Sequence, residues 1–113
     1  MLRSLLTELE QATGNDAALD RSVARAFDAV DATYTASAES CLELLHQALP
    51  GWHWHVGWAG NGVFPYARID KEGQRVRVEA PTVPLALLRA IVKAGLGDLD
   101  PPAPTPPRPV WQR

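Results

Sequence analysis

Two histidines stand two residues apart and offer the most direct possibility of chemistry in this chain. In an extended strand His53 and His55 point to the same side, and imidazole nitrogens are good ligands for transition metals. A zinc-type site needs at least a third protein ligand nearby. Glu79 is on the same predicted face but two strands from His55, roughly 9–10 Å away at ordinary strand spacing. We therefore expect neither a metal site nor a cofactor.

The single cysteine is the next candidate, as a nucleophile. Cys41 falls on the apolar side of a predicted helix, where a cysteine usually behaves as a small buried hydrophobe, and His46 is rotated away from it. The acidic residues are spread over helix surfaces without a converging pair for acid and base catalysis. The sequence therefore predicts that the protein is not an enzyme.

A third group combines arginines with aromatic rings and the two histidines in the same part of the chain. Guanidinium groups donate paired hydrogen bonds to carboxylates or phosphates, and rings add stacking surfaces, so this composition favours protein or nucleotide contact. The alternative is a solvated face, or one covered by acidic helices of the same chain or a partner. A tryptophan near the C-terminus could dock on another surface. The candidate contact residues are His53, His55, Phe64, Tyr66, Arg68, Arg75, Arg77 and Trp111.

Three strands must position these side chains, because residues 52–80 alternate between apolar and polar types. Glycine-containing turns at 59–62 and 71–74 predict an antiparallel meander. If both are four-residue loops, Trp58 pairs with Val63 and Asp70 pairs with Arg75. The predicted cross-strand rows are then His53-Arg68-Arg77 and His55-Tyr66-Glu79.

This register gives the sheet one apolar face and one cationic, aromatic face. The three tryptophans of the first strand alternate with its histidines and match valines across the sheet, so we expect them in the core. The predicted apolar face consists of Trp52, Trp54, Val56, Trp58, Val63, Pro65, Ala67, Ile69, Val76, Val78 and Ala80.

Four helices surround the predicted strands. Leucine spacing predicts the first over 2–13, and Asn15 or Asp16 caps the second, whose apolar stripe runs from Leu19 to Val30. Thr35 or Ser37 begins the third, and Pro50-Gly51 ends it. Thr82 caps the fourth, with a stripe of Leu85, Leu88, Ile91 and Val92, and Gly95 closes it.

The predicted fold is α+β in the order α-α-α-β-β-β-α, with a three-stranded antiparallel meander packed against helices. We expect one domain over 1–97, made of an N-terminal helical hairpin at 1–31 and an α-β-β-β-α core at 36–95. Residues 98–113 form a proline-rich tail that includes Trp111 and is extended or disordered.

Composition limits the function classes. The 113 residues are 46% hydrophobic and contain one cysteine, which excludes an internal disulfide, and no run approaches the roughly 18 apolar residues of a membrane span. Charged residues interrupt the N-terminus, so we expect no signal peptide and a reduced cytoplasmic setting. Residues 1–50 carry three arginines against eight acidic residues, a net charge of −5, whereas 51–113 carry +3, with eight basic against five acidic. A dedicated nucleic-acid binder would be strongly basic, so nucleic acid is an unlikely partner.

Three stretches share a pattern with a known group: LTELEQATGNDAALDRSVARAF, YTASAESCLELLHQALPGWHW and APTVPLALLRAIVKAG. The more specific parts are YTAS with the leucine-rich run into LPGW, and the last helix start, where Thr82-Val83-Pro84 replaces Thr-Pro. Together they resemble the phage ABA (α-β-α) sandwich domain. The resemblance implies an α/β/α sandwich, a phage or prophage origin and action inside a bacterial cell, and it supplies no catalytic residue.

These observations favour a small phage accessory protein that acts by binding, with a host factor or defence component as its target. The alternative is a sponge that sequesters a nucleotide signal on the arginines and stacks its base on Tyr66 or Phe64. Double-stranded RNA binding is a weaker third hypothesis, because the last helix offers only Arg89 and Lys93. Unpaired strand edges and the opposite charges of the two halves predict a homodimer. We expect contact through the helices or the tryptophan strand.

Overall fold

Three helices precede a three-stranded antiparallel sheet, and a fourth helix follows it, in the computed structural model, which describes residues 2–58, 60 and 62–101. This arrangement confirms the α+β class and the order of elements. The elements are α1 (Leu2–Gln11), α2 (Ala17–Ala26), the 3₁₀ helix η1 (Tyr34–Ala36), α3 (Ala38–Ala48), β1 (His53–Trp58), β2 (Pro65–Lys71), β3 (Gln74–Glu79) and α4 (Val83–Gly95).

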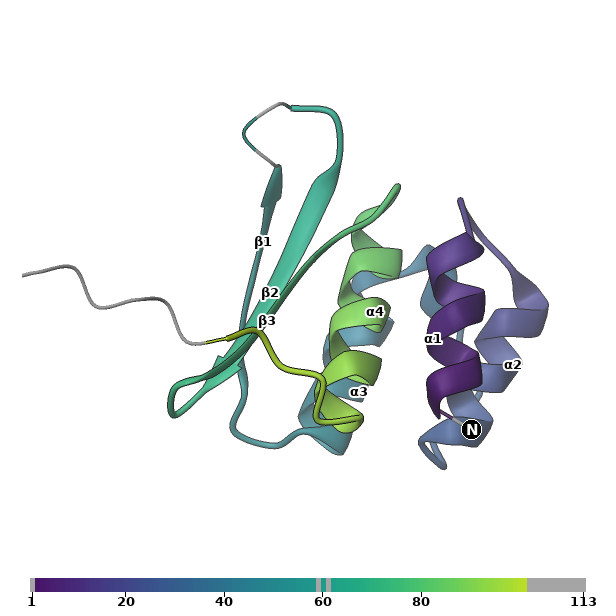
Figure 1. Ribbon diagram of the computed structural model, residues 1–113. Helices are drawn as coiled ribbons and strands as arrows, with labels where there is room; N and C mark the ends of the chain where they lie inside the picture. Colours follow the sequence, from purple (N-terminus) through teal and green to yellow (C-terminus); the bar gives the residue numbers. More distant parts are fainter. Residues whose placement is uncertain (1, 59, 61, 102–113) are drawn as a thin grey trace, which may run out of the picture.

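The elements form three layers: the sheet, then α3 with α4, then α1 with α2 (Figure 1). The sandwich implied by the family resemblance would place helices on both faces of the sheet. Here every described helix lies on one side of the sheet. Helix α1 packs against α4, and α2 packs against α1 and η1. No described element covers the other face of the sheet, and the acidic helices α1 and α2 lie on the opposite side.

Helix α4 is the central element, because it packs against β2, β3, α1, α3 and η1. The predicted stripe of Leu85, Leu88, Ile91 and Val92 is buried, and Ala86, Leu87 and Ala90 on its other sides are buried as well. A helix with apolar residues on most of its sides belongs in the interior, and only Arg89 and Lys93 interrupt this pattern in α4. The Thr82 hydroxyl accepts the Leu85 N–H at 3.3 Å, as expected of an N-cap. The helix ends at Gly95, as predicted; Leu96 is its C-cap, and Gly97 follows with a φ of +74°.

A buried threonine joins the N-terminal helices to the core. The hydroxyl of Thr35 donates to Asp20 Oδ1 at 2.7 Å and accepts the Asp16 N–H at 2.8 Å. Asp16 itself caps α2. Thr35 therefore lies in η1 and links it to α2, while Ser37 is the residue that caps α3. The prediction that Val30 belongs to the buried stripe of α2 is wrong: the helix ends at Ala26, and Val30 is 76% exposed.

The second hairpin has the predicted register, with Asp70 opposite Arg75, and Gly73 takes the positive φ its turn requires. The first hairpin is shifted by two residues, since Trp58 pairs with Pro65 and not with Val63. Residues 59–64 therefore form the connection, and Val63 is 59% exposed. A two-residue shift leaves each side chain on its predicted face, because strand side chains alternate with a period of two.

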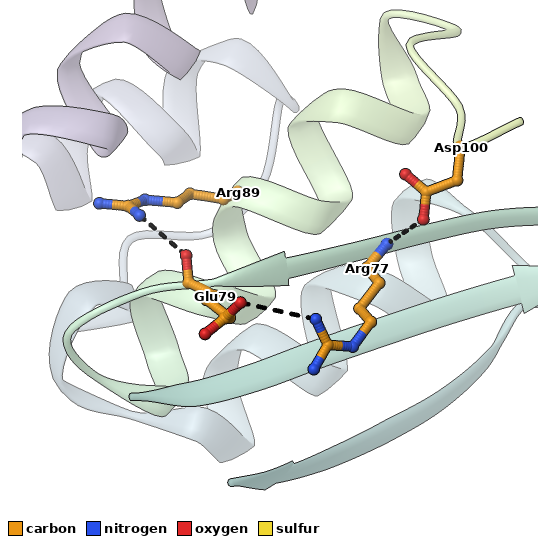
Figure 2. Close-up of polar contacts among 4 residues, drawn as sticks. All are labelled: Arg77, Glu79, Arg89 and Asp100. Carbon is orange, nitrogen blue, oxygen red and sulfur yellow. Dashed lines mark hydrogen bonds and ion pairs between the residues drawn. The ribbon is translucent and has the colours of Figure 1, made fainter. Parts of the chain in front are cut away.

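The segment after α4 returns to the outer edge of β3. Asp100 donates its N–H to the Arg75 carbonyl at 2.8 Å, and its carboxylate accepts the Arg77 N–H at 2.9 Å (Figure 2). Leu99 packs against the core, so residues 98–101 lie against the domain. The rest of the proline-rich tail, residues 102–113 with Trp111, lies outside the described residues.

Candidate binding surface on the open face of the sheet

The open face of the sheet brings most of the predicted contact residues together in three cross-strand rows. With the observed register these rows are His53-Asp70-Arg75, His55-Arg68-Arg77 and Gly57-Tyr66-Glu79, so the predicted pairing of each histidine is wrong by two residues of β2. We call this the arginine face. Its members from the predicted set are His53, His55, Tyr66, Arg68, Arg75 and Arg77.

Tyr66 is the centre of a packed platform on the arginine face. Its ring lies across Gly57, where an added Cβ would come within 3.1 Å of the ring. The Arg77 guanidinium lies 4.4 Å from the ring centroid, and the His55 ring is 5.7 Å away. Arg77 also forms an ion pair with Glu79 at 3.6 Å (Figure 2). The side chain of Arg77 is therefore engaged within the chain, and Tyr66 is enclosed by its neighbours.

Arg68 and Arg75 are the arginines of this face whose side chains have no bonded partner among the described residues. Over the ranges the structure describes, neither guanidinium forms an ion pair or a hydrogen bond, and the Arg68 Nε is sealed from solvent without an acceptor. Arg68 also stands directly opposite Arg77, and like charges at opposed positions destabilise a sheet. A negatively charged partner would relieve this repulsion and accept hydrogen bonds from the guanidinium.

The helix-facing side of β1 differs from the prediction. Trp54 and Trp58 were expected in the core but are 44% and 65% exposed. They lie on the same face as Ile69 and Val76, which are fully buried, but α4 covers only β2 and β3. The edge strand extends beyond this helix, so its tryptophans are left at the margin of the core. Trp52 is half-buried.

Phe64 does not join the arginine face. It lies in the loop before β2, 44% exposed, and lines a hollow of about 430 Å³ with Glu10, Glu79 and Arg89. Arg89 donates to the carbonyls of Leu9, Glu10 and Glu79, each at 3.0 Å, and burial lowers the pKa of its guanidinium. This arginine thus ties the end of α1 to the end of β3, and Figure 2 shows its bond to Glu79. The signal for it in the sequence is an arginine in the middle of a mostly apolar helix, whose other charged residue, Lys93, lies in the last turn.

Cys41 has the surroundings of a structural residue. It is fully buried, its thiol donates to the Tyr34 carbonyl at 3.1 Å, and burial raises its pKa to about 12. The thiol is therefore protonated at neutral pH and cannot act as a thiolate nucleophile. Within residues 2–58, 60 and 62–101, no three His, Cys, Asp or Glu side chains come close enough to hold a metal ion.

Comparisons with known proteins found no counterpart: no family model, no curated protein and no solved structure matches the chain. None of the helices in the described part of the chain has the length and apolar character needed to cross a membrane.

Proposed function

We propose that the protein is a binding module that holds an acidic segment of another protein on its arginine face. The observation that carries this proposal is Arg68, which faces Arg77 across β2 and β3 and has no acidic partner among the described residues. A sheet tolerates opposed like charges at a cost in stability. Local violations of this kind tend to occur where a protein binds something.

The shape of the face favours a protein over a nucleotide. Small-molecule sites are usually concave and enclose the ligand, whereas the arginine face is the outer surface of a sheet. A sponge would also need a free ring for base stacking, but Tyr66 is enclosed by Gly57 and Arg77. Phe64 lies in a different hollow. Double-stranded RNA binding has less support, because α4 is central and buried and Arg89 is bonded to carbonyl groups.

The biological setting rests on the resemblance to the phage ABA sandwich domain. With that origin, the partner would be a host factor or defence component in the bacterial cytoplasm, and binding would inhibit it. The absence of a catalytic constellation in the sequence supports a non-enzymatic mode of action.

Capture from a bacterial lysate with charge-matched variants tests the proposal. The face variant is Arg68→Gln with Arg75→Gln, and the control is Arg3→Gln with Arg21→Gln, which removes the same charge from exposed positions of α1 and α2. The wild type and the control should retain a partner that the face variant loses, and retention should weaken with salt. Equal capture by both double variants, or turnover by the purified protein without a stable partner, would refute the proposal. Thermal shifts with cyclic nucleotides test the sponge, because a ligand at a hundredfold excess over Kd stabilises by about 2.7 kcal/mol.

A further inference from the structure

Strand β1 is accessible on both faces and along one edge. Among the described strands it pairs only with β2, and all of its residues are exposed or half-buried. The other edge strand is covered, because Asp100 bonds to the backbone of Arg75 and Arg77. As far as the structure describes the chain, nothing bonds in the same way to the outer edge of β1. The fold therefore protects one edge of its sheet and leaves the other open.

The hydrogen-bond pattern identifies which groups face the open edge. In an antiparallel sheet the N–H and C=O of one residue point to the same neighbouring strand, and successive residues alternate. Ala80 donates its N–H to the Pro65 carbonyl, so the odd-numbered residues of β2 bond to β3 and the even-numbered ones bond to β1. The observed register pairs those even-numbered residues with the odd-numbered residues of β1. The free backbone groups of β1 thus belong to Trp54, Val56 and Trp58.

The composition of β1 does not oppose pairing along this edge. Proteins usually protect an exposed edge with a lysine, another charge, a proline or a bulge. The sequence of β1, HWHVGW, contains no Lys, Arg, Asp, Glu or Pro. By contrast β3 carries Arg75 and Arg77, which would repel a second copy of themselves.

We propose that β1 pairs antiparallel with β1 of a second copy, about a two-fold axis that passes midway between the two copies of Val56. This register places Val56 opposite itself and Trp54 opposite Trp58 of the partner subunit. All three residues then form hydrogen-bonded pairs, giving about six N–H···O bonds across the seam. Because the register pairs even-numbered residues with even-numbered residues, the tryptophans of both copies lie on the same face of the joined sheet. The product is a six-stranded sheet with an isologous, closed interface.

The exposed tryptophans supply apolar area at this seam. With about 250 Å² per tryptophan, exposures of 44% and 65% leave about 110 and 160 Å² on Trp54 and Trp58. Their sum is about a third of the 800 Å² or so that each partner buries in a standard interface. Strand edges and Val56 add to this area, so we expect a dimer of moderate affinity. Because α4 covers only β2 and β3, there is room between the two helical layers for the tryptophans.

Other occupants of this edge are less well matched. Contact between the acidic α1–α2 layer and the arginine face would run head to tail, because these surfaces are on opposite sides of the molecule, and such contacts form open chains unless a ring closes. Pro101, the last described residue, follows Asp100 at the outer edge of β3, which is the edge opposite β1. The dimer also leaves the arginine face free, so it does not depend on the proposed partner.

Sedimentation velocity between about 1 and 100 µM tests the dimer. The mass should rise from 12.3 kDa toward twice this value with concentration, for the full chain and for a chain that ends at Pro101. Val56→Pro removes an N–H that makes no bond to β2, and Trp58→Lys replaces a side chain that is already exposed. Both variants should remain monomeric at 100 µM, with wild-type far-ultraviolet circular dichroism, whereas Val30→Lys, at a site 76% exposed, should dimerise normally.

Disulfide trapping tests the register. Opposed residues of a hydrogen-bonded pair have Cα atoms about 5.5 Å apart, within the range of a disulfide. Val56→Cys should therefore crosslink to itself under mild oxidation, and Trp54→Cys should crosslink to Trp58→Cys when mixed but not to itself. The native Cys41 is buried and serves as the unreactive background. Four outcomes would each overturn the proposal. The mass could stay at 12.3 kDa up to 100 µM, or a dimer could survive both Val56→Pro and Trp58→Lys. A dimer could also disappear when the chain ends at Pro101, or Trp54→Cys could crosslink to itself.

Discussion

Replacement of Arg89 is the sharpest test of how the layers are held together. Its guanidinium donates to the carbonyls of Leu9, Glu10 and Glu79 at 3.0 Å, and these carbonyls belong to the ends of α1 and β3. Arg89→Met keeps a long apolar side chain but removes every one of these bonds. Arg89→Lys keeps the charge but offers a single ammonium in place of a planar, forked donor.

The expected loss follows from the number and exposure of the bonds. A hydrogen bond to a charged group contributes about 1.5–3 kcal/mol when it is well shielded. Two of the three carbonyls belong to exposed residues and can rebind water, so we take about 1 kcal/mol for each bond. Arg89→Met should then lower the free energy of unfolding by about 3 kcal/mol, and Arg89→Lys by about half as much. For a domain of this size, 3 kcal/mol corresponds to a fall in Tm of about 12–24 °C.

Urea denaturation followed by circular dichroism measures both losses. Arg21→Met is the matched control, since Arg21 is exposed on α2 and should change stability by less than about 0.5 kcal/mol. If Arg89→Met stays within about 0.5 kcal/mol of the wild type, the guanidinium does not hold α1 to the sheet. If Arg89→Lys matches the wild type, charge alone is sufficient and the forked geometry is unimportant.

Three further predictions concern stability. Trp54→Ala should cost about 1–2 kcal/mol at sub-micromolar concentration and Ile69→Ala about 3–4 kcal/mol, because only Ile69 is fully buried; equal losses in urea denaturation would mean that Trp54 is covered in solution. Thr35→Val keeps the shape but leaves the Asp20 carboxylate and the Asp16 N–H without the hydroxyl, so it should cost about 2 kcal/mol by thermal unfolding. Burial raises the pKa of Cys41 to about 12, so its contribution to stability should be constant below about pH 9 and fall as the pH rises toward 12, because the unfolded chain loses this proton first. The urea midpoint of Cys41→Ala should therefore depend less steeply on pH than that of the wild type, and an equally steep dependence would contradict this explanation.

Local features of the fold were predictable from the sequence because their causes are local. Asp16, Ser37 and Thr82 each precede an apolar helical repeat, and each caps its helix. Gly73 provides the positive φ of the second turn, which fixes the register of β2 and β3. In each case the residue acts on neighbours within a few positions along the chain.

The register of the first hairpin was not predictable in the same way. Alternation distinguishes the two faces of a strand, but shifts of zero and two residues satisfy it equally well. The loop length had to decide, and Val63 and Phe64 look like strand residues although they belong to the connection. The wrong register gave His53 and His55 cross-strand partners two residues away from their observed partners in β2, but it assigned each strand residue to the correct face. Apart from Phe64, which lies in the connection, the strand residues of the arginine face were therefore predicted on the correct side, and their cross-strand neighbours in β1 and β2 were not.

The exposure of the tryptophans has a different cause, which is the width of the layers. A helix with its side chains is about 10–12 Å across, and strands are spaced about 4.8 Å apart, so one helix covers about two strands. Helix α4 is buried on most of its sides, and it covers β2 and β3 while α1 and α3 pack on its other sides. A third strand in such a sheet must extend beyond the helix whatever its sequence. The aromatic residues of β1 therefore do not complete the core formed by residues 2–58, 60 and 62–101, and their burial requires a surface beyond these residues.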